Sequence, residues 1–212
     1  GLTPEITTLP AGLQGWAASN PSSLPTPSNF TTSGTIFANK DITANGSAST
    51  TTGAIYNYNK KLGFLNGGSF LDLSIGLALN TTGNSGIRVQ YDAMVIRNAT
   101  GVGSTPTTRI NQLVLQYRVG TTAAFTTLLP TAYENGNALV QQKIDANDIS
   151  PQNNQVIKVI LPAECDNQPE VQIRWISRQV SGTGSRSSFA IDNIDIRSDN
   201  TAPITEAGYP KT

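Results

Sequence analysis

Residues 71–79 read Leu-Asp-Leu-Ser-Ile-Gly-Leu-Ala-Leu, so that Leu or Ile occupies every second position. Successive side chains of an extended strand point to opposite sides, and this alternation therefore gives the strand one fully apolar face. The stretch predicts a core strand that packs this face against the rest of the domain. No part of the chain forms a convincing amphipathic helix; the nearest approach, 138–147, is interpreted as one turn or an irregular connection.

Further β-type runs, separated by Gly, Asn and Pro, lie on both sides of this strand. The expected strands are 35–38, 54–58, 70–79, 87–97, 110–119, 125–129, 156–161, 171–179 and 189–197. Residues 63–70 are interpreted as a turn, and the proline-rich residues 1–35 as short edge strands or a wrapping segment that Trp16 fixes to the core. Short strands at this spacing are typical of an all-β, antiparallel β-sandwich with jelly-roll topology.

The charge and the rare residues exclude several classes of function. The chain has 212 residues, with 14 basic and 14 acidic side chains, no His and one Cys. Without His it has no Ser-His-Asp triad and no His-ligated zinc, and a single Cys cannot form an internal disulfide. A balanced charge gives no basis for capture of nucleic acid, and no apolar stretch approaches the roughly 20 residues of a membrane span. We therefore expect neither nucleic-acid binding nor membrane insertion.

The composition changes near residue 200. Residues 1–199 are expected to form one jelly-roll module, because all-β domains of about 200 residues are common. Residues 200–212 have no apolar periodicity and are expected to be a linker to a following module. Charged residues make up only 13% of the chain, and Thr, Asn and Gly are abundant. This composition is typical of secreted bacterial β-proteins, so we expect an extracellular module, secreted or on the bacterial cell surface.

Three of the expected strands, 87–97, 110–119 and 171–178, carry polar side chains on one face and apolar side chains on the other. Trp175 belongs to the apolar face and is expected in the core. Arg and Gln recur on the polar face, and their planar, multi-donor groups suit bidentate hydrogen bonds to sugar hydroxyls, carboxylates or sulfates. The candidate ligand-binding residues are Arg88, Gln90, Asp92, Gln116, Arg118, Gln172, Arg174 and Arg178.

Two interpretations of this polar face remain open. It is either the solvated outer side of an antiparallel sheet or, if the strands are neighbours, a concave platform on which a glycan lies. The run 190–196 also places Asp192 and Asp195 in an apolar strand, where a carboxylate needs backbone N–H groups, an Arg or a calcium ion as partner. Asp192 is the candidate ligand of a structural calcium ion, and hydrogen bonds that anchor the strand are the alternative.

A catalytic site is not expected, although the composition permits one kind. A glycoside hydrolase needs two facing carboxylates and no His. The carboxylates of the chain lie mostly in loops beside Asn, Gly or Pro, and no two of them have a recognisable spacing. The candidates are Asp72, Asp92, Glu134, Asp145, Asp148, Glu164, Asp166 and Glu170.

Several short motifs between residues 9 and 197 resemble motifs that occur in a group of secreted modules. Residues 184–194, Gly-Ser-Arg-Ser-Ser-Phe-Ala-Ile-Asp-Asn-Ile, are similar to the last strand of MAM-like, concanavalin-like and carbohydrate-binding jelly rolls, where a second Asp often stands in place of Asn193. Residues 9–16, Leu-Pro-Ala-Gly-Leu-Gln-Gly-Trp, and 171–175, Val-Gln-Ile-Arg-Trp, are similar to an opening and a late strand of modules from large secreted or surface proteins of polymer-degrading bacteria. The resemblance implies a jelly-roll fold and a non-catalytic binding or adhesion function.

The sequence thus predicts a non-catalytic, extracellular carbohydrate-binding module of a larger multimodular protein. Its expected partners are a polysaccharide or cell-surface glycan and further modules of the parent protein, and no cofactor is expected beyond the structural calcium ion. A structural or adhesive spacer without a small-molecule site is the alternative. A two-carboxylate glycoside hydrolase is the third and least favoured hypothesis.

Overall fold

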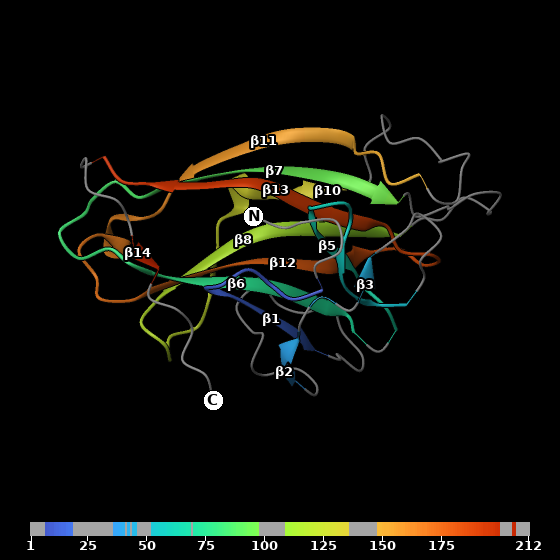
Figure 1. Ribbon diagram of the computed structural model, residues 1–212, viewed down its shortest axis with the longest axis horizontal. Coiled ribbons are helices and arrows are strands. Elements are labelled where there is room, and N and C mark those ends of the chain that lie inside the picture. Colours follow the sequence, from blue (N-terminus) through green and yellow to red (C-terminus); the bar gives the residue numbers. More distant parts are fainter. Residues whose placement is uncertain are drawn as a thin grey trace.

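The structure is a computed structural model, and it describes residues 7–18, 36–40, 42, 44–45, 52–68, 70–97, 109–135, 148–199 and 205–206. In these residues two sheets are stacked face to face, with sheet B above sheet A in Figure 1. Sheet A has the strand order β10 (Tyr133–Glu134), β8 (Ile110–Val119), β12 (Val171–Ser181), β6 (Asp72–Asn80), β1 (Leu13–Ala18) and β2 (Ile36–Lys40). Sheet B has the order β11 (Gln152–Ile160), β7 (Arg88–Arg97), β13 (Ser188–Arg197), β5 (Leu62–Leu65), β4 (Ala54–Asn57) and β3 (Ala44–Asn45).

Smaller elements complete the sandwich. In sheet A, β9 (Thr126–Thr127) pairs with β8, and β14 (Thr205–Glu206) pairs with the end of β6. Short 3-10 helices, η1 (Leu129–Thr131) and η2 (Ala163–Cys165), lie in connections. Within the described ranges β3 and β4 run parallel and the other pairings are antiparallel. The all-β antiparallel jelly-roll sandwich expected from the sequence is confirmed.

The apolar stripe of residues 71–79 forms the middle of the core, as its alternation predicts. Leu73, Ile75 and Leu79 of β6 are buried against the opposite sheet. β6 pairs with β12 in a register that sets Ile75 opposite Trp175. The ring of Trp175 meets the ring of Tyr91 on β7 edge to face, with the two centroids 5.5 Å apart. Because β12 belongs to sheet A and β7 to sheet B, this aromatic pair joins the two layers.

Two strands differ from the sequence-based expectation. β1 was expected at most as an edge strand, but it lies inside sheet A between β6 and β2. Residues 63–65 belong to the segment 63–70 that was expected as a turn, but they lie in β5, which pairs with β4 and β13. The hairpin between β4 and β5 turns at Asn59 and Lys60, whose φ angles of 51° and 74° are those of a type I′ turn. Gly63 is required beneath this turn, because a Cβ there would overlap the ring of Tyr58.

The remaining expected segments can be compared with the structure where it describes their residues. The expected strand 156–161 begins earlier, at Gln152, and 125–129 is reduced to β9 followed by η1. The irregular segment 138–147 lies outside the described residues. Of the expected linker 200–212, the structure describes Thr205–Glu206, which pair with Asn80 and Leu79 at the end of β6. No helix in the described part of the chain has the length and apolar character needed to cross a membrane.

Candidate functional site

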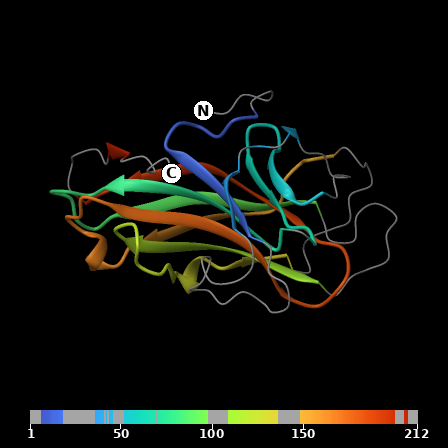
Figure 2. The same cartoon turned by 90° about the horizontal axis from the view of Figure 1, so that it is seen from below.

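The structure divides the candidate ligand-binding residues between two surfaces. β8 and β12 are neighbours in sheet A, whereas β7 lies in sheet B. The three polar-faced strands therefore do not form one platform. Gln116, Arg118, Gln172, Arg174 and Arg178 lie on the outer side of sheet A, while Arg88, Gln90 and Asp92 lie on the outer side of sheet B. Figure 2 shows β6, β12 and β8 (green, orange and yellow-green) side by side in sheet A.

On sheet A, the Arg and Gln side chains bind one another across β8 and β12. The Nε of Arg174 donates to Oε1 of Gln116 at 2.7 Å. The Nε and Nη2 of Arg118 both donate to Oε1 of Gln172, at 2.9 and 2.6 Å. These pairs follow directly from the strand register, which places Arg174 opposite Gln116 and Gln172 opposite Arg118. The planar groups that suggested glycan recognition are therefore engaged in bonds within the protein.

The aromatic ring of Phe125 packs against both Arg side chains of this network. The guanidinium carbons of Arg174 and Arg118 lie 3.8 and 4.4 Å from the ring centroid of Phe125, within the range of cation–π attraction. Arg174 is only 2% exposed, and Gln116 and Gln172 are buried as well. A ligand in solution has little access to groups this deeply covered. On the described geometry, these residues form a largely buried polar layer on the outer side of sheet A.

A buried charge pair lies on the same side of sheet A, two outward positions beyond Arg174 and past Ile176. Asp72 on β6 lies in register with Arg178 on β12, and both side chains are buried. Desolvation raises the pKa of Asp72 to about 6, while the charges of Arg178 and Arg174 act in the opposite direction. Burial in turn lowers the pKa of Arg178, and Asp72 partly restores it. Burial of these two charged groups therefore costs free energy, and neither side chain is placed for contact with solvent.

We predict that Arg174→Ala destabilises the fold, because it leaves Gln116 buried without its donor and removes the cation stacked on Phe125. A buried hydrogen bond to a charged group is worth about 1.5–3 kcal/mol, and the free energy of unfolding is expected to fall by that amount. Urea denaturation followed by tryptophan fluorescence measures it. Arg118→Ala, at a half-buried position of the same network, is the matched control and is expected to cost less. Equal losses in the two variants would contradict the assignment of Arg174 to the buried layer.

The outer side of sheet B is open, in contrast to sheet A. A groove of about 610 Å³ runs along β11, β7 and β13, and these strands lie side by side in the upper layer of Figure 1. The register arranges its outward side chains in rows across the strands: Ile160, Arg88 and Arg197 form one row, and Lys158, Gln90 and Asp195 form the next. Its lining residues are Arg88, Val89, Gln90, Lys158, Val159, Ile160, Asp195 and Arg197.

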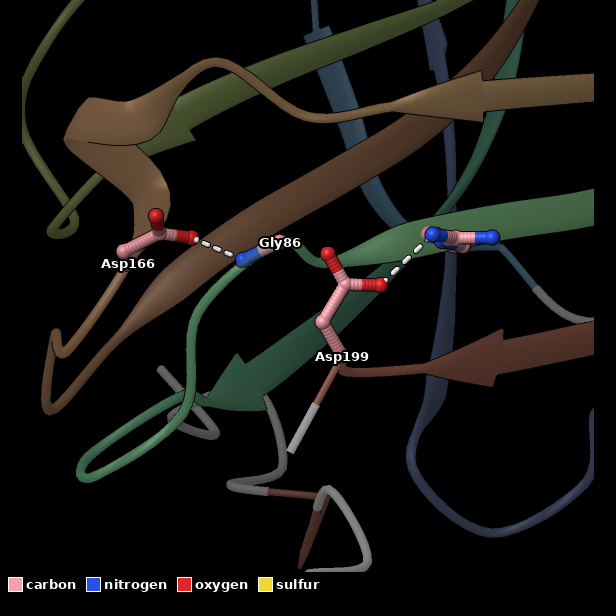
Figure 3. Close-up of polar contacts among 4 residues, drawn as sticks. Gly86, Asp166 and Asp199 are labelled. Carbon is pink, nitrogen blue, oxygen red and sulfur yellow. Dashed lines mark hydrogen bonds and ion pairs between the residues drawn. The ribbon is translucent and has the colours of Figure 1, made fainter. Parts of the chain in front are cut away.

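Two ion pairs orient the Arg side chains of the groove. Nη2 of Arg88 lies 2.7 Å from Oδ1 of Asp199, and Nε of Arg197 lies 2.8 Å from Oδ2 of Asp195. Gly86 makes the position of Asp199 possible: its φ of 62° is left-handed, and a Cβ there would overlap the Asp199 carboxylate. The N–H of Gly86 donates to Oδ1 of Asp166 at 2.9 Å, which fixes this turn (Figure 3).

The predicted calcium ligand Asp192 lies beyond the groove, in the row of Asp92. The two carboxylates are on residues paired in register on β13 and β7. Asn193, with a φ of 50° at a break in the register, lies between them: its N–H donates to Oδ1 of Asp192 at 2.9 Å and its Nδ2 donates to Oδ2 of Asp92 at 2.8 Å. No group of three or more His, Cys, Asp or Glu suited to a metal ion occurs in the described residues. The calcium ion therefore stays a prediction, and the observed hydrogen bonds are those of the anchoring alternative.

The other candidate carboxylates serve local hydrogen bonds. Glu164 accepts from the Tyr117 hydroxyl at 2.7 Å, and Glu170 accepts from Nε2 of Gln172 at 2.5 Å. Glu134 on β10 accepts from Gln112 at 2.9 Å. Asp145 lies outside the described residues. These contacts give the carboxylates structural roles at sheet edges and in turns.

Of the residues that line the groove, the sequence analysis named only Arg88 and Gln90 as candidate ligand-binding residues. Lys158 and Ile160 belong to β11, a strand that was predicted from its apolar residues alone. Arg197 is the last residue of β13. A signal was present in Val156-Ile157-Lys158-Val159-Ile160, where the outward positions alternate with the inward Ile157 and Val159. Val156 and Ile160 are each 57% exposed, which is unusual for large aliphatic side chains.

No known protein family and no curated protein matches the chain. Solved structures of similar fold include a CBM61 carbohydrate-binding module in complex with β-1,4-galactotriose, with a TM-score of 0.36 and 8% identity over 68% of this chain and 73% of that one. A second is CBM28, a module specific for non-crystalline cellulose, with a TM-score of 0.43 and 12% identity over 85% and 98%. A third is the N-terminal cellulose-binding domain of Cellulomonas fimi β-1,4-glucanase C, with a TM-score of 0.36 and 12% identity over 72% and 87%.

Proposed function

We propose that this chain is a non-catalytic carbohydrate-binding module that holds a polysaccharide along the groove on sheet B. The observation that carries the proposal is the groove itself. The groove is open, has a volume of about 610 Å³ and runs across three neighbouring strands of sheet B. A site on strands keeps its geometry before the ligand arrives, so less free energy is lost on ordering it.

The chemistry of the lining suits a sugar chain. Gln90, in the middle of the groove, offers both donors and acceptors, as sugar hydroxyls do. Asp195 supplies acceptors and Lys158 supplies donors in the same row. Ile160, which is exposed at the edge strand, offers an apolar surface to the C–H face of a sugar ring. Affinity from such a shallow site is modest, and an extracellular parent protein with several modules would raise it by multivalency.

We predict that removing the central amide and the apolar edge together, in Gln90→Ala/Ile160→Ala, weakens polysaccharide binding about tenfold, the equivalent of one lost hydrogen bond and one apolar contact. Affinity electrophoresis against a panel of soluble neutral and acidic polysaccharides measures the loss as reduced retardation. Gln112→Ala, on the outer side of sheet A, is the matched control and is expected to bind like the original protein.

Two results would overturn the proposal. Retardation by no polysaccharide of the panel would favour a structural or adhesive spacer. Retardation that survives in Gln90→Ala/Ile160→Ala would show that a glycan binds elsewhere on the molecule. Thermal unfolding of each variant checks that the substitutions, which lie on an exposed face, leave the fold intact.

A further inference from the structure

The groove on sheet B brings two guanidinium groups together. Arg88 on β7 and Arg197 on β13 are paired in register, so their side chains leave the same face of the sheet directly beside each other. Like charges directly opposite each other on neighbouring strands are destabilising. Lys158 adds a third cation in the next row, on β11. Among the lining residues three cations thus face one carboxylate, that of Asp195.

The ion pairs that Arg88 and Arg197 form with carboxylates are exposed to solvent. The side chains of Arg88 and Asp199 are 61% and 52% exposed, and those of Arg197 and Asp195 are 76% and 40% exposed. Exposed ion pairs contribute little to stability because water and salt screen them. An external anion can therefore exchange with either carboxylate at small cost. For Lys158 no side-chain ion pair or hydrogen bond is found within the described ranges.

The charges also give the groove a direction. Successive outward residues of a strand are about 6.6 Å apart, so the Arg row, the Lys158–Gln90 row and the Asp92–Asp192 row follow one another at roughly that spacing. The first row is cationic and the third is anionic. A chain lying along β7 would meet favourable potential for a negative group at the Arg end and repulsion at the Asp end.

We propose that the ligand of this groove is an anionic polysaccharide, whose carboxylate or sulfate groups bind between Arg88 and Arg197. Guanidinium groups present parallel N–H donors that match the oxygens of either anion, and such charge-assisted bonds are stronger than neutral ones. Gln90 and Lys158 then receive the hydroxyls and the next ring of the same chain. This inference rests on the proposed function and specifies the chemical class of its ligand.

The test compares polymers that differ in charge alone. Biolayer interferometry with immobilised polygalacturonate and its methyl-esterified form tests carboxylate recognition, and dextran sulfate with unmodified dextran tests sulfate recognition. We expect at least one charged polymer to bind about tenfold or more tightly than its uncharged counterpart, as one charge-assisted hydrogen bond provides. Binding to that polymer is also expected to weaken with added salt.

Charge variants separate the groove from general attraction. Arg197→Gln is expected to weaken binding to the preferred charged polymer about tenfold. Asp195→Asn, which releases Arg197 from its internal partner, is expected to strengthen it. Lys60→Gln removes the same single charge from the exposed turn between β4 and β5, and is expected to leave binding unchanged.

Each possible outcome has a defined meaning. A neutral polymer could bind as tightly as the charged ones, with this binding lost in Gln90→Ala/Ile160→Ala. That result would overturn the proposal of an anionic ligand, while the proposed function would stand. Equal losses in Arg197→Gln and Lys60→Gln would overturn it as well, because the attraction would then come from charge in general. Binding to none of these polymers would overturn the anionic ligand, and affinity electrophoresis against the wider panel then decides whether the proposed function stands.

Discussion

Trp175→Ala is expected to lower the free energy of unfolding by about 3–5 kcal/mol, the usual cost of emptying a large aromatic site in a core. Trp175 has no exposed surface and meets Tyr91 of the other sheet edge to face. The substitution therefore removes apolar burial within sheet A and an aromatic contact between the sheets at once. Such a loss is a large part of the stability of a typical domain, and the variant is expected to unfold at a much lower temperature.

Urea denaturation followed by circular dichroism measures this loss. The control is Trp16→Ala, since Trp16 is the other Trp of the chain. Trp16 is only half-buried and packs on Val114 and Ile176 on the outer side of sheet A. Its replacement is expected to cost less than half as much. If the two variants lose the same stability, the contact between the sheets at Trp175 is not the centre of the core.

Asp72 is expected to make the protein less stable as the pH rises from about 4 to 7. Desolvation raises the pKa of its buried carboxyl from 3.8 to about 6, against the opposing charges of Arg178 and Arg174. A raised carboxyl pKa means that the folded state binds the proton more tightly than the unfolded state. The contribution of Asp72 is therefore fully present below pH 3.8 and is lost as the pH rises through about 6. The shift corresponds to about 3 kcal/mol.

Comparison with Asp72→Asn isolates this contribution from the other carboxylates. The free energy of unfolding of each protein is measured by urea denaturation at several pH values between about 4 and 8, where the unfolded carboxyl titrates first. The difference between the original protein and Asp72→Asn is expected to change with pH in the direction given above. Glu134→Gln, which removes an exposed carboxylate from β10, is the matched control for the loss of one negative charge. Parallel curves for the original protein and Asp72→Asn would show that folding does not raise the pKa of Asp72.

The alternation of side chains allowed the core strands to be predicted and left the short strands unrecognised. Ile75 and Trp175 fall in the core because one buried face imposes a period of two on a strand. β5 was missed because its hairpin turns at Asn59 and Lys60, where the left-handed φ of Lys60 has no sequence signal. β1 was missed because neighbouring prolines and glycines concealed a strand that pairs on both sides.

Alternation also separated the two sides of each strand correctly but gave no information on which strands are neighbours. The pairing of β8 with β12 and of β7 with β13 joins residues far apart in the chain, and it decides which polar side chains meet. Polar side chains on an outer face can be exposed, like Arg88, or buried, like Arg174, and the two cases look alike in the sequence. The neighbouring side chains decide between these two cases. Gln116 accepts a hydrogen bond from Arg174, and the ring of Phe125 covers its guanidinium group.

The order of the strands has a consequence for how the chain folds. In sheet A, β12 lies between β8 and β6, and in sheet B, β13 lies between β7 and β5. One late stretch, residues 171–197, thus supplies an inner strand to both sheets. During synthesis, β5, β6, β7 and β8 each emerge from the ribosome long before the partner that covers one of their edges. Long-range pairing of this kind is slow, and uncovered edges invite association with other chains. The nascent chain therefore depends on protection of these edges until residues 171–197 have been made.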